Sequence, residues 1–350
     1  MKRYIIPIFI PHLGCPHQCV FCDQRTITGR QAPPGVDAVA AVIEANLASL
    51  RQPRFIEVAF YGGSFTALPA ARQEELLTPA KARLDAGRVH AIRVSTRPDA
   101  VDEAVTARLK AYGVATVELG VQSLDDAVLA AAGRGHTAAD VDRAVAALRR
   151  AGLACGLQLM PGLPGEDWPS LIATARASLN LQPDFARIYP TVVIAGTPLA
   201  ELHRRGAYRP LSLTAAVARA AYLKGLFENN RIPVIRVGLQ ATEELAGGAV
   251  VAGPYHPAFG EMVEAFTFRL MVGRLLERLD PAAGEKIVIR HNTRDTSAIR
   301  GLANANTKAW QALYPLTKFI FQPDWPQRGA INLRHKSTNY VVNKTMLYDN

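Results

Sequence analysis

Cysteine is scarce in this sequence, long apolar runs are missing, and no segment is repetitive. Four cysteines in 350 residues do not form the disulfide framework of a small secreted protein. No stretch reaches the ~18–20 consecutive apolar residues that a membrane span needs. We find neither a solenoid-type repeat nor a low-complexity tract. These absences favour a folded, soluble protein of the cytoplasm, where thiols stay reduced and can bind metal.

Acidic residues are also in the minority. The chain has 30 Asp and Glu against 40 Lys and Arg, a net charge of +10, and most of the basic residues are arginines. From Arg290 to Asn350, nine basic residues face only three acidic ones. Guanidinium groups bind phosphate through paired hydrogen bonds, so this charge predicts a polyanionic partner such as RNA. The alternative is a composition that favours arginine everywhere, without any binding role.

Short β-like runs alternate with amphipathic stretches as far as Tyr189. Repetition of a strand and a helix produces a parallel sheet covered by helices, so the sequence predicts the α/β class and a partial or full TIM-type (β/α) barrel. The predicted strands are Tyr4–Ile10, Phe55–Phe60, Ala91–Ser95, Ala115–Val121, Ala154–Met160 and Phe185–Tyr189. The predicted helices are Val36–Leu50, Ala71–Ala86, Asp102–Tyr112, Ala138–Ala151 and Trp168–Leu179.

The pattern changes after Tyr189, where helices dominate. We predict two domains, a barrel over residues 1–245 and a small basic α+β region over residues 246–350 that binds RNA or substrate. The glycine- and proline-rich stretch Ala246–Gly260 indicates a linker or loop. Other predicted elements are helices at Pro198–Arg205, Ser212–Asn229, Glu261–Leu279 and Thr296–Leu313, strands at Ile232–Leu239 and Lys286–His291, and a hairpin at Phe319–Leu333.

Three of the four cysteines lie in one short segment after the first predicted strand. Cys15, Cys19 and Cys22 have the spacing C-x3-C-x2-C, whereas Cys155 lies in an apolar strand and is expected to be a buried core residue. A structural zinc site usually has four ligands, which would require a nearby histidine such as His12. Three thiolates instead suit a cubane iron–sulfur cluster with one iron left open for a further ligand.

With Phe21 included, the segment reads C-x3-C-x-aromatic-C and resembles the signature of radical S-adenosylmethionine (SAM) enzymes. The resemblance implies that Cys15, Cys19 and Cys22 hold a [4Fe-4S] cluster whose open iron binds SAM. Reductive cleavage of SAM then yields a 5′-deoxyadenosyl radical that abstracts hydrogen from the substrate. The protein supplies binding, orientation and exclusion of water. The resemblance also implies an electron donor of the flavodoxin or ferredoxin type.

Further motifs of this resemblance end the predicted strands. Gly62 and Gly63 of FYGGSF stand where the family binds the methionine amino group of SAM. Ser95 of VSTRPD stands where relatives often have a glutamate, so a neutral hydroxyl replaces a charge. Gln122 of ELGVQS and Arg134 of GRGHT match the family's contacts to the ribose and the methionine carboxylate.

The remaining candidates are two residues that contact the cofactors and two residues on the substrate side. Gln158 stands where relatives place a ribose contact, and Phe21 accompanies the cluster. Tyr189 ends the sixth predicted strand and would face the site. His256 lies in the segment GPYHPAFG, a loop that would close over the site; a packed turn is the alternative.

The ordered motifs STRPD, ELGVQS, GRGHT, LMPGLPG and RIYPTVVIAGTPLAEL narrow the resemblance to the radical SAM domain of the Elongator catalytic subunit, over Tyr4 to Leu245. That family adds a carboxymethyl-type group to the wobble uridine of tRNA, with acetyl-CoA supplied through an acetyltransferase domain. No such domain is recognisable after Gly260. We therefore expect a shortened, bacterial Elongator-like form, and leave open whether a separate acetyltransferase partner exists.

Three functions remain open on the sequence. The first is a radical SAM enzyme acting on tRNA or another RNA. The second is a radical SAM enzyme acting on a small molecule, as in the related oxygen-independent coproporphyrinogen oxidases. The third is a non-catalytic scaffold that binds metal or RNA, with zinc in place of the cluster. Iron content, SAM cleavage and RNA binding distinguish them.

Overall fold

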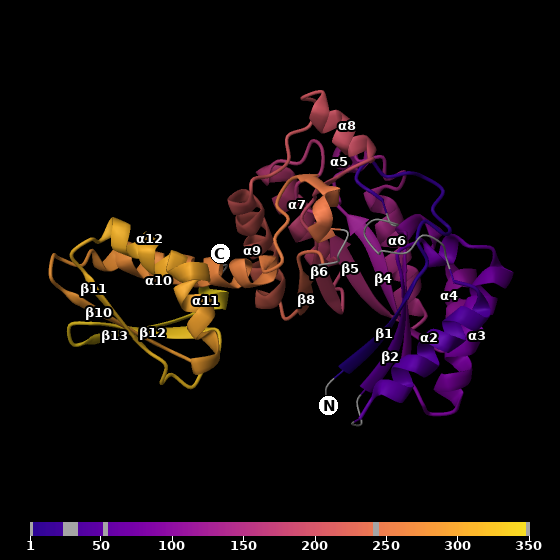
Figure 1. The fold of residues 1–350 in the computed structure, drawn as a ribbon, viewed down its shortest axis with the longest axis horizontal. Helices are drawn as coiled ribbons and strands as arrows, with labels where there is room; N and C mark the ends of the chain where they lie inside the picture. Colours follow the sequence, from indigo (N-terminus) through magenta and orange to yellow (C-terminus); the bar gives the residue numbers. More distant parts are fainter. Residues whose placement is uncertain (1–2, 24–33, 52–54, 241–244, 348–350) are drawn as a thin grey trace. The chain divides into compact units, whose positions relative to one another are not determined.

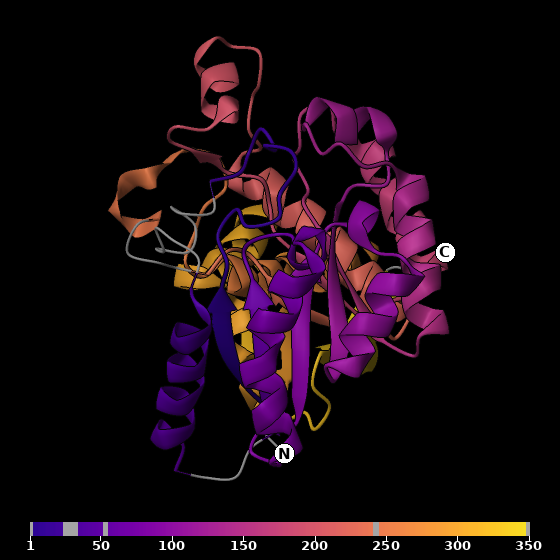
Figure 2. The same cartoon turned by 90° about the vertical axis from the view of Figure 1, so that its right-hand side faces the viewer.

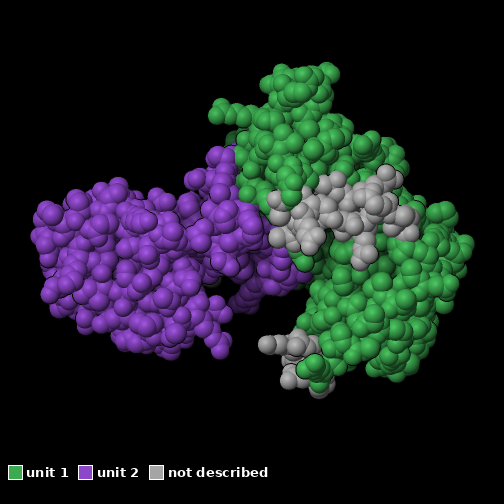
Figure 3. Space-filling model, viewed as in Figure 1, with its two compact units in different colours: residues 1–211, 240–255 green, residues 212–239, 256–350 purple. Residues whose placement is uncertain are grey.

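The computed structural model describes residues 3–23, 34–51, 55–240 and 245–347. The chain divides into two compact units, residues 1–211 with 240–255 and residues 212–239 with 256–350 (Figure 3). Within the described ranges, every helix is too short or too polar to serve as a membrane span. The predicted domain boundary at residue 245 directly follows residues 241–244, which lie outside the described ranges, and it stays a prediction.

A parallel sheet forms the centre of the first unit. Its strands follow one another in sequence order, and each neighbouring pair runs parallel. Figures 1 and 2 show them side by side as one curved sheet, which confirms the predicted α/β class and its partial barrel. The sheet has seven strands in the order β1-β2-β3-β4-β5-β6-β8, the last of which is β8 (Val234–Val237). The first unit contributes β1 (Arg3–Phe9), β2 (Phe55–Tyr61), β3 (Ala91–Thr96), β4 (Val114–Gln122), β5 (Ala154–Leu159) and β6 (Phe185–Ile188).

Helices connect the strands, as a parallel sheet requires. Several begin at a side chain that caps the free backbone N–H groups: Asp102, Thr137 and Asp167 each accept a hydrogen bond from a first-turn amide. The six-residue α5 was not predicted, because one and a half turns give too little periodicity. The helices are α2 (Val36–Ser49), α3 (Ala70–Asp85), α4 (Glu103–Ala111), α5 (Asp126–Ala131), α6 (Ala138–Arg150), α7 (Trp168–Asn180) and α8 (Pro198–Arg204).

The predicted linker Ala246–Gly260 is partly wrong. Strand β9 (Val250–Ala252) pairs antiparallel with β7 (Val193–Ile194), and α10 already begins at Phe259. Valines flanked by glycines can form a short strand, which the composition of the stretch concealed. This segment therefore belongs to the structure of the first unit as far as Tyr255.

The second unit combines helices with a four-stranded sheet in the order β11-β10-β12-β13. Its core is formed by apolar residues of α10 and the sheet, with Trp310 and Ile299 from two shorter helices. The elements are α9 (Leu213–Asn229), β8 (Val234–Val237), α10 (Phe259–Leu279), β10 (Lys286–His291), α11 (Thr296–Arg300), α12 (Ala305–Leu313), β11 (Lys318–Gln322), β12 (Ala330–His335) and β13 (Thr338–Asn343).

Two predictions for the second unit are wrong. The single helix Thr296–Leu313 is broken after Arg300, because Gly301, Ala303 and Asn304 all have positive φ. The predicted hairpin Phe319–Leu333 does not form: β11 pairs parallel with β10, which separates it from β12. The true hairpin joins β12 to β13.

Candidate active site at the carboxyl ends of the strands

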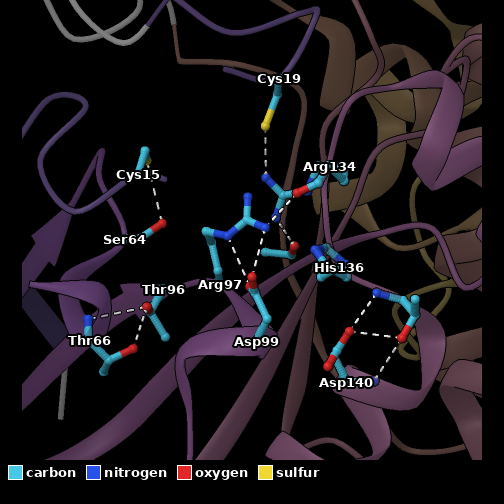
Figure 4. A network of polar contacts seen from close by, with 12 residues as sticks. Cys15, Cys19, Ser64, Thr66, Thr96, Arg97, Asp99, Arg134, His136 and Asp140 are labelled. Atoms are coloured by element: carbon cyan, nitrogen blue, oxygen red, sulfur yellow. Dashed lines mark hydrogen bonds and ion pairs between the residues drawn. The ribbon is translucent and has the colours of Figure 1, made fainter. Parts of the chain in front are cut away.

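A loop between β1 and α2 carries the three clustered cysteines. Cys19 is buried, Cys15 and Cys22 are half-buried, and no disulfide joins any of them. Figure 4 shows the side chains of Cys15 and Cys19 pointing from this loop toward the carboxyl ends of the strands. Active sites of barrel-type α/β folds lie at that end of the sheet, so the predicted cluster loop is in the expected place.

The first half of the cysteine loop is fixed to the end of β2. The backbone N–H of Ser64 donates to the carbonyl of Leu13 at 3.0 Å, and the Ser64 hydroxyl lies 3.4 Å from the Cys15 sulfur. A Cβ on Gly63 would lie 2.2 Å from the Leu13 carbonyl oxygen, so only glycine permits this approach. Gly62 has φ of 101°, which also favours glycine. The paired glycines thus hold the loop, whatever else they bind.

The second half of the loop is fixed on the opposite side. The Val20 N–H donates to the Ala132 carbonyl at 3.1 Å, and the Leu199 N–H donates to the Val20 carbonyl at 2.7 Å. Phe21 is 8% exposed and packs in an apolar cluster that includes Cys19 and Leu199. The aromatic residue of the motif therefore anchors the loop in the core, and its contact with a cofactor stays a prediction.

Arg134 reaches the cysteine loop from the segment after α5. Its Nη1 donates to the Cys19 sulfur at 3.2 Å, and its Nη2 donates to the carbonyl of Gly120. The side chain is buried, and its Nε has no hydrogen-bond partner in the structure. A buried guanidinium beside a sulfur supplies positive charge to an anionic group, and its unused N–H is available to an acceptor.

Gln122 and Gln158 meet at the ends of β4 and β5. The Gln158 Nε2 donates to Gln122 Oε1 at 3.2 Å. Gln122 is buried and has a φ of 68°, in the left-handed region that a non-glycine residue adopts at a cost. Gly120 lies between the Gln122 and Arg134 side chains, since its Cβ would be 3.0 Å and 3.2 Å from them. The structure therefore brings together three of the predicted cofactor residues.

Arg97 positions Arg134. Its guanidinium donates twice to the Asp99 carboxylate, at 2.9 and 3.0 Å, and once to the Arg134 backbone carbonyl. Figure 4 shows this chain of contacts leading from Asp99 to the Cys19 sulfur. These contacts give Arg97 a structural role.

His136 lies behind this chain of contacts. It is 4% exposed, and its Nε2 is 3.2 Å from the Val121 carbonyl oxygen. Burial lowers the pKa of His136 to about 4, and the neighbouring guanidinium of Arg134 adds to the effect. The imidazole is therefore neutral near pH 7 and serves as a buried hydrogen-bonding group.

A network of buried charges crosses the sheet on β2, β3, β4 and β6. Arg93, 1% exposed, donates to Glu57 at 2.8 Å and also to Glu118. Arg187 bonds the same Glu118 carboxylate at 3.0 Å. Ser95, the predicted replacement for a glutamate, lies 3.5 Å from Glu118 and so faces this network. A carboxylate is thus present close to Ser95, although it comes from the next strand.

Two tyrosines border the charge network. The Arg187 guanidinium donates to the Tyr189 hydroxyl at 3.0 Å and to the Tyr61 hydroxyl at 3.1 Å. Burial raises the pKa of Tyr61 to about 12, so the phenol stays protonated. Tyr189 is therefore held at the end of β6, beside the other strand ends, and its role toward substrate stays a prediction.

His256 belongs to the second unit, whereas the other site candidates belong to the first. Its Nδ1 accepts a hydrogen bond from the Ala258 N–H at 3.0 Å, in the turn before α10. This contact gives His256 a local structural role, and its predicted role toward substrate remains untested. Cys155 is buried as predicted, and burial raises its thiol pKa to about 12, so it remains protonated.

The donor set fits an iron–sulfur cluster better than zinc. Within the described ranges, no three His, Cys, Asp or Glu side chains converge on a point suited to one metal ion. Zinc would need its sulfurs at about 2.3 Å from a single centre, whereas a cubane spreads its thiolate ligands over several irons. Three cysteines on one loop, with the Arg134 Nη1 beside the Cys19 sulfur and the Arg134 Nε unpaired, suit a cluster together with an anionic ligand.

Family models match most of the first unit and part of the second. The radical SAM superfamily model matches residues 9–177, and the model of the radical SAM C-terminal domain matches residues 183–267. A solved structure, the archaeal Methanocaldococcus infernus Elp3 with an N-terminal deletion, superposes with a TM-score of 0.60 and 22% identity. The alignment covers 82% of this chain and 71% of that one, which supports the fold.

Curated proteins are also similar to this chain. An uncharacterised protein of Methanocaldococcus jannaschii is 30% identical over 223 residues, 60% of this chain and 67% of its own. A tRNA uridine(34) acetyltransferase of that organism is 34% identical over 39% of this chain, and one of Dehalococcoides mccartyi is 26% identical over 63%. The chain spans 26% and 56% of the length of those two enzymes.

The family models, the relatives and the cysteine motif agree. The chain is a member of the radical SAM superfamily, an enzyme whose cofactors are a [4Fe-4S] cluster and S-adenosylmethionine.

Proposed function

We propose that this enzyme modifies RNA and that its substrate is a uridine of tRNA. The observation that carries the proposal is the similarity to two tRNA uridine(34) acetyltransferases, which are 34% identical over 39% of this chain and 26% identical over 63% of it. The net charge of +10 supports it, because a basic protein attracts a polyanion. Reduced thiols and tRNA occur together in the cytoplasm, where we place the protein.

Three cysteines would hold the cluster, and four other side chains would hold SAM. In this proposal Cys15, Cys19 and Cys22 are the cluster ligands on a loop fixed at both ends. When bound, the cluster and SAM supply one-electron cleavage of SAM and a carbon-centred radical. The orphaned Arg134 Nε would bind the SAM carboxylate, and the amides of Gln122 and Gln158 would bind its ribose.

The remaining predicted contacts depend on the same arrangement. The Gly62–Gly63 turn would bind the methionine amino group, and Ser95 would contribute a hydroxyl backed by Glu118. Tyr189 and the neutral Tyr61 phenol would border the substrate, with Arg187 holding both hydroxyls. A flavodoxin or ferredoxin would supply the electron.

The decisive experiment is anaerobic reconstitution with iron, sulfide and SAM, followed by reduction with and without bulk tRNA. We expect a brown protein that forms 5′-deoxyadenosine, and a mass change in a uridine after digestion of the tRNA to nucleosides. The triple variant Cys15→Ala/Cys19→Ala/Cys22→Ala should lose iron and 5′-deoxyadenosine together. The control Cys155→Ala should keep both, because Cys155 lies in a core strand.

Two results would contradict the proposal at different levels. Iron retained by the triple cysteine variant would refute the assignment of the cluster ligands. Formation of 5′-deoxyadenosine with no change in any tRNA nucleoside, even with a flavodoxin reductant, would leave the enzyme class intact but refute the tRNA substrate and favour a small molecule.

A further inference from the structure

The four-stranded sheet of the second unit has one face covered and one face without a helix on it. The residues that alternate along the strands, such as Ile287, Ile289 and Leu333, pack with α10, Ile299 of α11 and Trp310 of α12 in one core. Figure 1 shows α10 and α12 along one side of this sheet. The intervening residues therefore point to the opposite face.

The opposite face carries the basic and polar side chains of these strands, together with Val288, Ile320 and Val341. Strand register aligns its residues in rows across the sheet, so they form one continuous surface. We name this surface the basic sheet face; one row joins Gln322, Arg290 and Asn332, and cations flank it. The basic sheet face comprises Lys286, Arg290, Lys318, Gln322, Asn332 and Arg334.

The charge of this face is of one sign. The strands β10, β11, β12 and β13 contain no Asp or Glu. Lys286, Lys318 and Arg334 are exposed, and the described part of the chain offers none of them an ion pair. Arg290 pairs with Asp324, from the loop after β11, at 3.0 Å. Three cations on one face thus remain to be neutralised by a partner.

Most of the net charge of the chain lies in this unit. Residues 212–239 and 256–350 contain 17 Lys and Arg against 9 Asp and Glu, a net of +8 out of +10. An arginine-rich composition without a binding role would spread the charge over both units in proportion to their length. The concentration therefore favours an interaction surface, and the sign favours a phosphate-rich partner.

Two polar atoms near the face are buried and have no partner. Asn332 is 5% exposed, and its Oδ1 accepts no hydrogen bond in the structure. The indole Nε1 of Trp325 is likewise unsatisfied, and this ring stacks with the Arg290 guanidinium at 5.5 Å. Buried polar groups are normally paired, so an unpaired amide and indole beside free cations point to a missing ligand with donors and acceptors.

We propose that the basic sheet face binds a single-stranded segment of RNA. Lys286, Lys318 and Arg334 bind phosphates, and the Asn332 amide bonds a base edge. Trp325, already held by Arg290, offers an aromatic surface for stacking. This inference rests on the proposed function, because it gives the enzyme the surface that holds the RNA whose uridine is modified.

The test compares two triple variants of the full-length protein. Lys286→Gln/Lys318→Gln/Arg334→Gln removes three charges from the basic sheet face. The control Arg269→Gln/Arg294→Gln/Lys308→Gln removes three exposed, unpaired charges elsewhere in the same unit, among the described residues. Binding of a labelled anticodon stem-loop RNA is measured by fluorescence anisotropy at several salt concentrations, and thermal melting checks folding.

We expect the face variant to bind RNA at least about tenfold more weakly than the wild type. Its plot of log affinity against log salt should also be less steep, with a slope smaller in magnitude by about 2. The control variant should stay within about twofold of the wild type. Equal losses in both variants would mean a diffuse charge effect and overturn the proposal. The proposal would also be overturned if the wild type bound no RNA. It would be overturned as well if the face variant kept its RNA affinity but was no longer reduced by an acidic flavodoxin.

Asn332→Leu tests base recognition separately from charge. Leucine has a similar size and needs no hydrogen bond, so a purely structural amide with an unpaired oxygen would be replaced without loss of stability. We expect an unchanged or raised melting temperature together with several-fold weaker RNA binding. Unchanged RNA affinity would overturn the role of Asn332.

The proposed function and this inference can fail independently. Formation of 5′-deoxyadenosine without RNA is measured on every variant and should not change, since no variant alters the cluster loop. A wild type that makes no 5′-deoxyadenosine refutes the enzymatic proposal. RNA binding that persists in the face variant refutes only the surface.

Discussion

At the residue scale, Gly63 shows how one missing side chain positions three cysteines. A Cβ there would lie 2.2 Å from the Leu13 carbonyl oxygen and 2.6 Å from that of Ile10. We expect Gly63→Ala to lower the free energy of unfolding by about 1–3 kcal/mol and to reduce iron loading, because the loop must move. Urea unfolding and iron analysis test this.

The control for Gly63 is a glycine with open space. Nothing lies within 4 Å of a Cβ on Gly273, in the middle of α10. Gly273→Ala should therefore stabilise the protein by up to about 1 kcal/mol through helix propensity and leave iron binding unchanged. Equal iron loading in the two variants would contradict the role assigned to Gly63.

His136 gives a residue-scale prediction for pH. Burial, then the charges of Arg134 and Arg97, lowers its pKa to about 4 from an unfolded value near 6.5. The unfolded chain therefore binds a proton first as pH falls, and stability decreases between about pH 6.5 and pH 4, by about 3 kcal/mol in all. His136→Gln keeps a hydrogen-bond donor but cannot titrate, so its unfolding free energy should depend less on pH over that range. Identical profiles would refute the assignment.

At the element scale, the strands of the first unit were predictable because β-branched runs alternate with helices. Which strands pair was not predictable. The sequence predicts a hairpin of Phe319–Gln322 with Ala330–Leu333, yet β10 lies between these two strands. Local pattern states that a segment is extended, not which neighbour it bonds. The break in Thr296–Leu313 was hidden for the same reason, since Ala303 has high helix propensity but a φ of 50°.

That break supplies the element-scale prediction. Alanine in the left-handed region costs about 1–2 kcal/mol, a cost that glycine avoids. We expect Ala303→Gly to raise the free energy of unfolding by about 0.5–1 kcal/mol. Ala309→Gly, inside α12, should lower it by about 1 kcal/mol. Urea unfolding of both variants measures these changes in the free energy of unfolding. A loss of stability in Ala303→Gly would show that the left-handed backbone at residue 303 is not costly.

At the scale of the whole molecule, the site was predictable where the fold itself places residues. Strand ends meet at one edge of a parallel sheet, and Gln122 and Gln158, both predicted to contact the ribose, are hydrogen-bonded there. The charge network was not foreseen, because Glu57, Arg93 and Glu118 each occur singly in an apolar strand. Their partners lie on the neighbouring strand, and the sequence does not show which residues of two neighbouring strands face each other.

The charge network supports a prediction about the stability of the first unit. Removing Arg93 leaves two buried carboxylates, Glu57 and Glu118, short of a partner. Arg93→Met should therefore lower the free energy of unfolding by about 3–5 kcal/mol. Arg88→Met breaks a surface pair with Glu44, which keeps Arg83 as a partner, and should cost far less. Similar losses in both variants, measured by denaturant unfolding, would contradict the buried network.

The interleaved order of segments in the two units has a practical consequence. The chain passes from one unit to the other after Leu211, Leu239 and Tyr255. No uninterrupted stretch of sequence consists of one unit alone: residues 1–255 contain the first unit together with residues 212–239 of the second, and residues 212–350 contain the second unit together with residues 240–255 of the first. A protease that nicks a single junction therefore leaves a segment of one unit covalently joined to the other, so one cut cannot separate the two units.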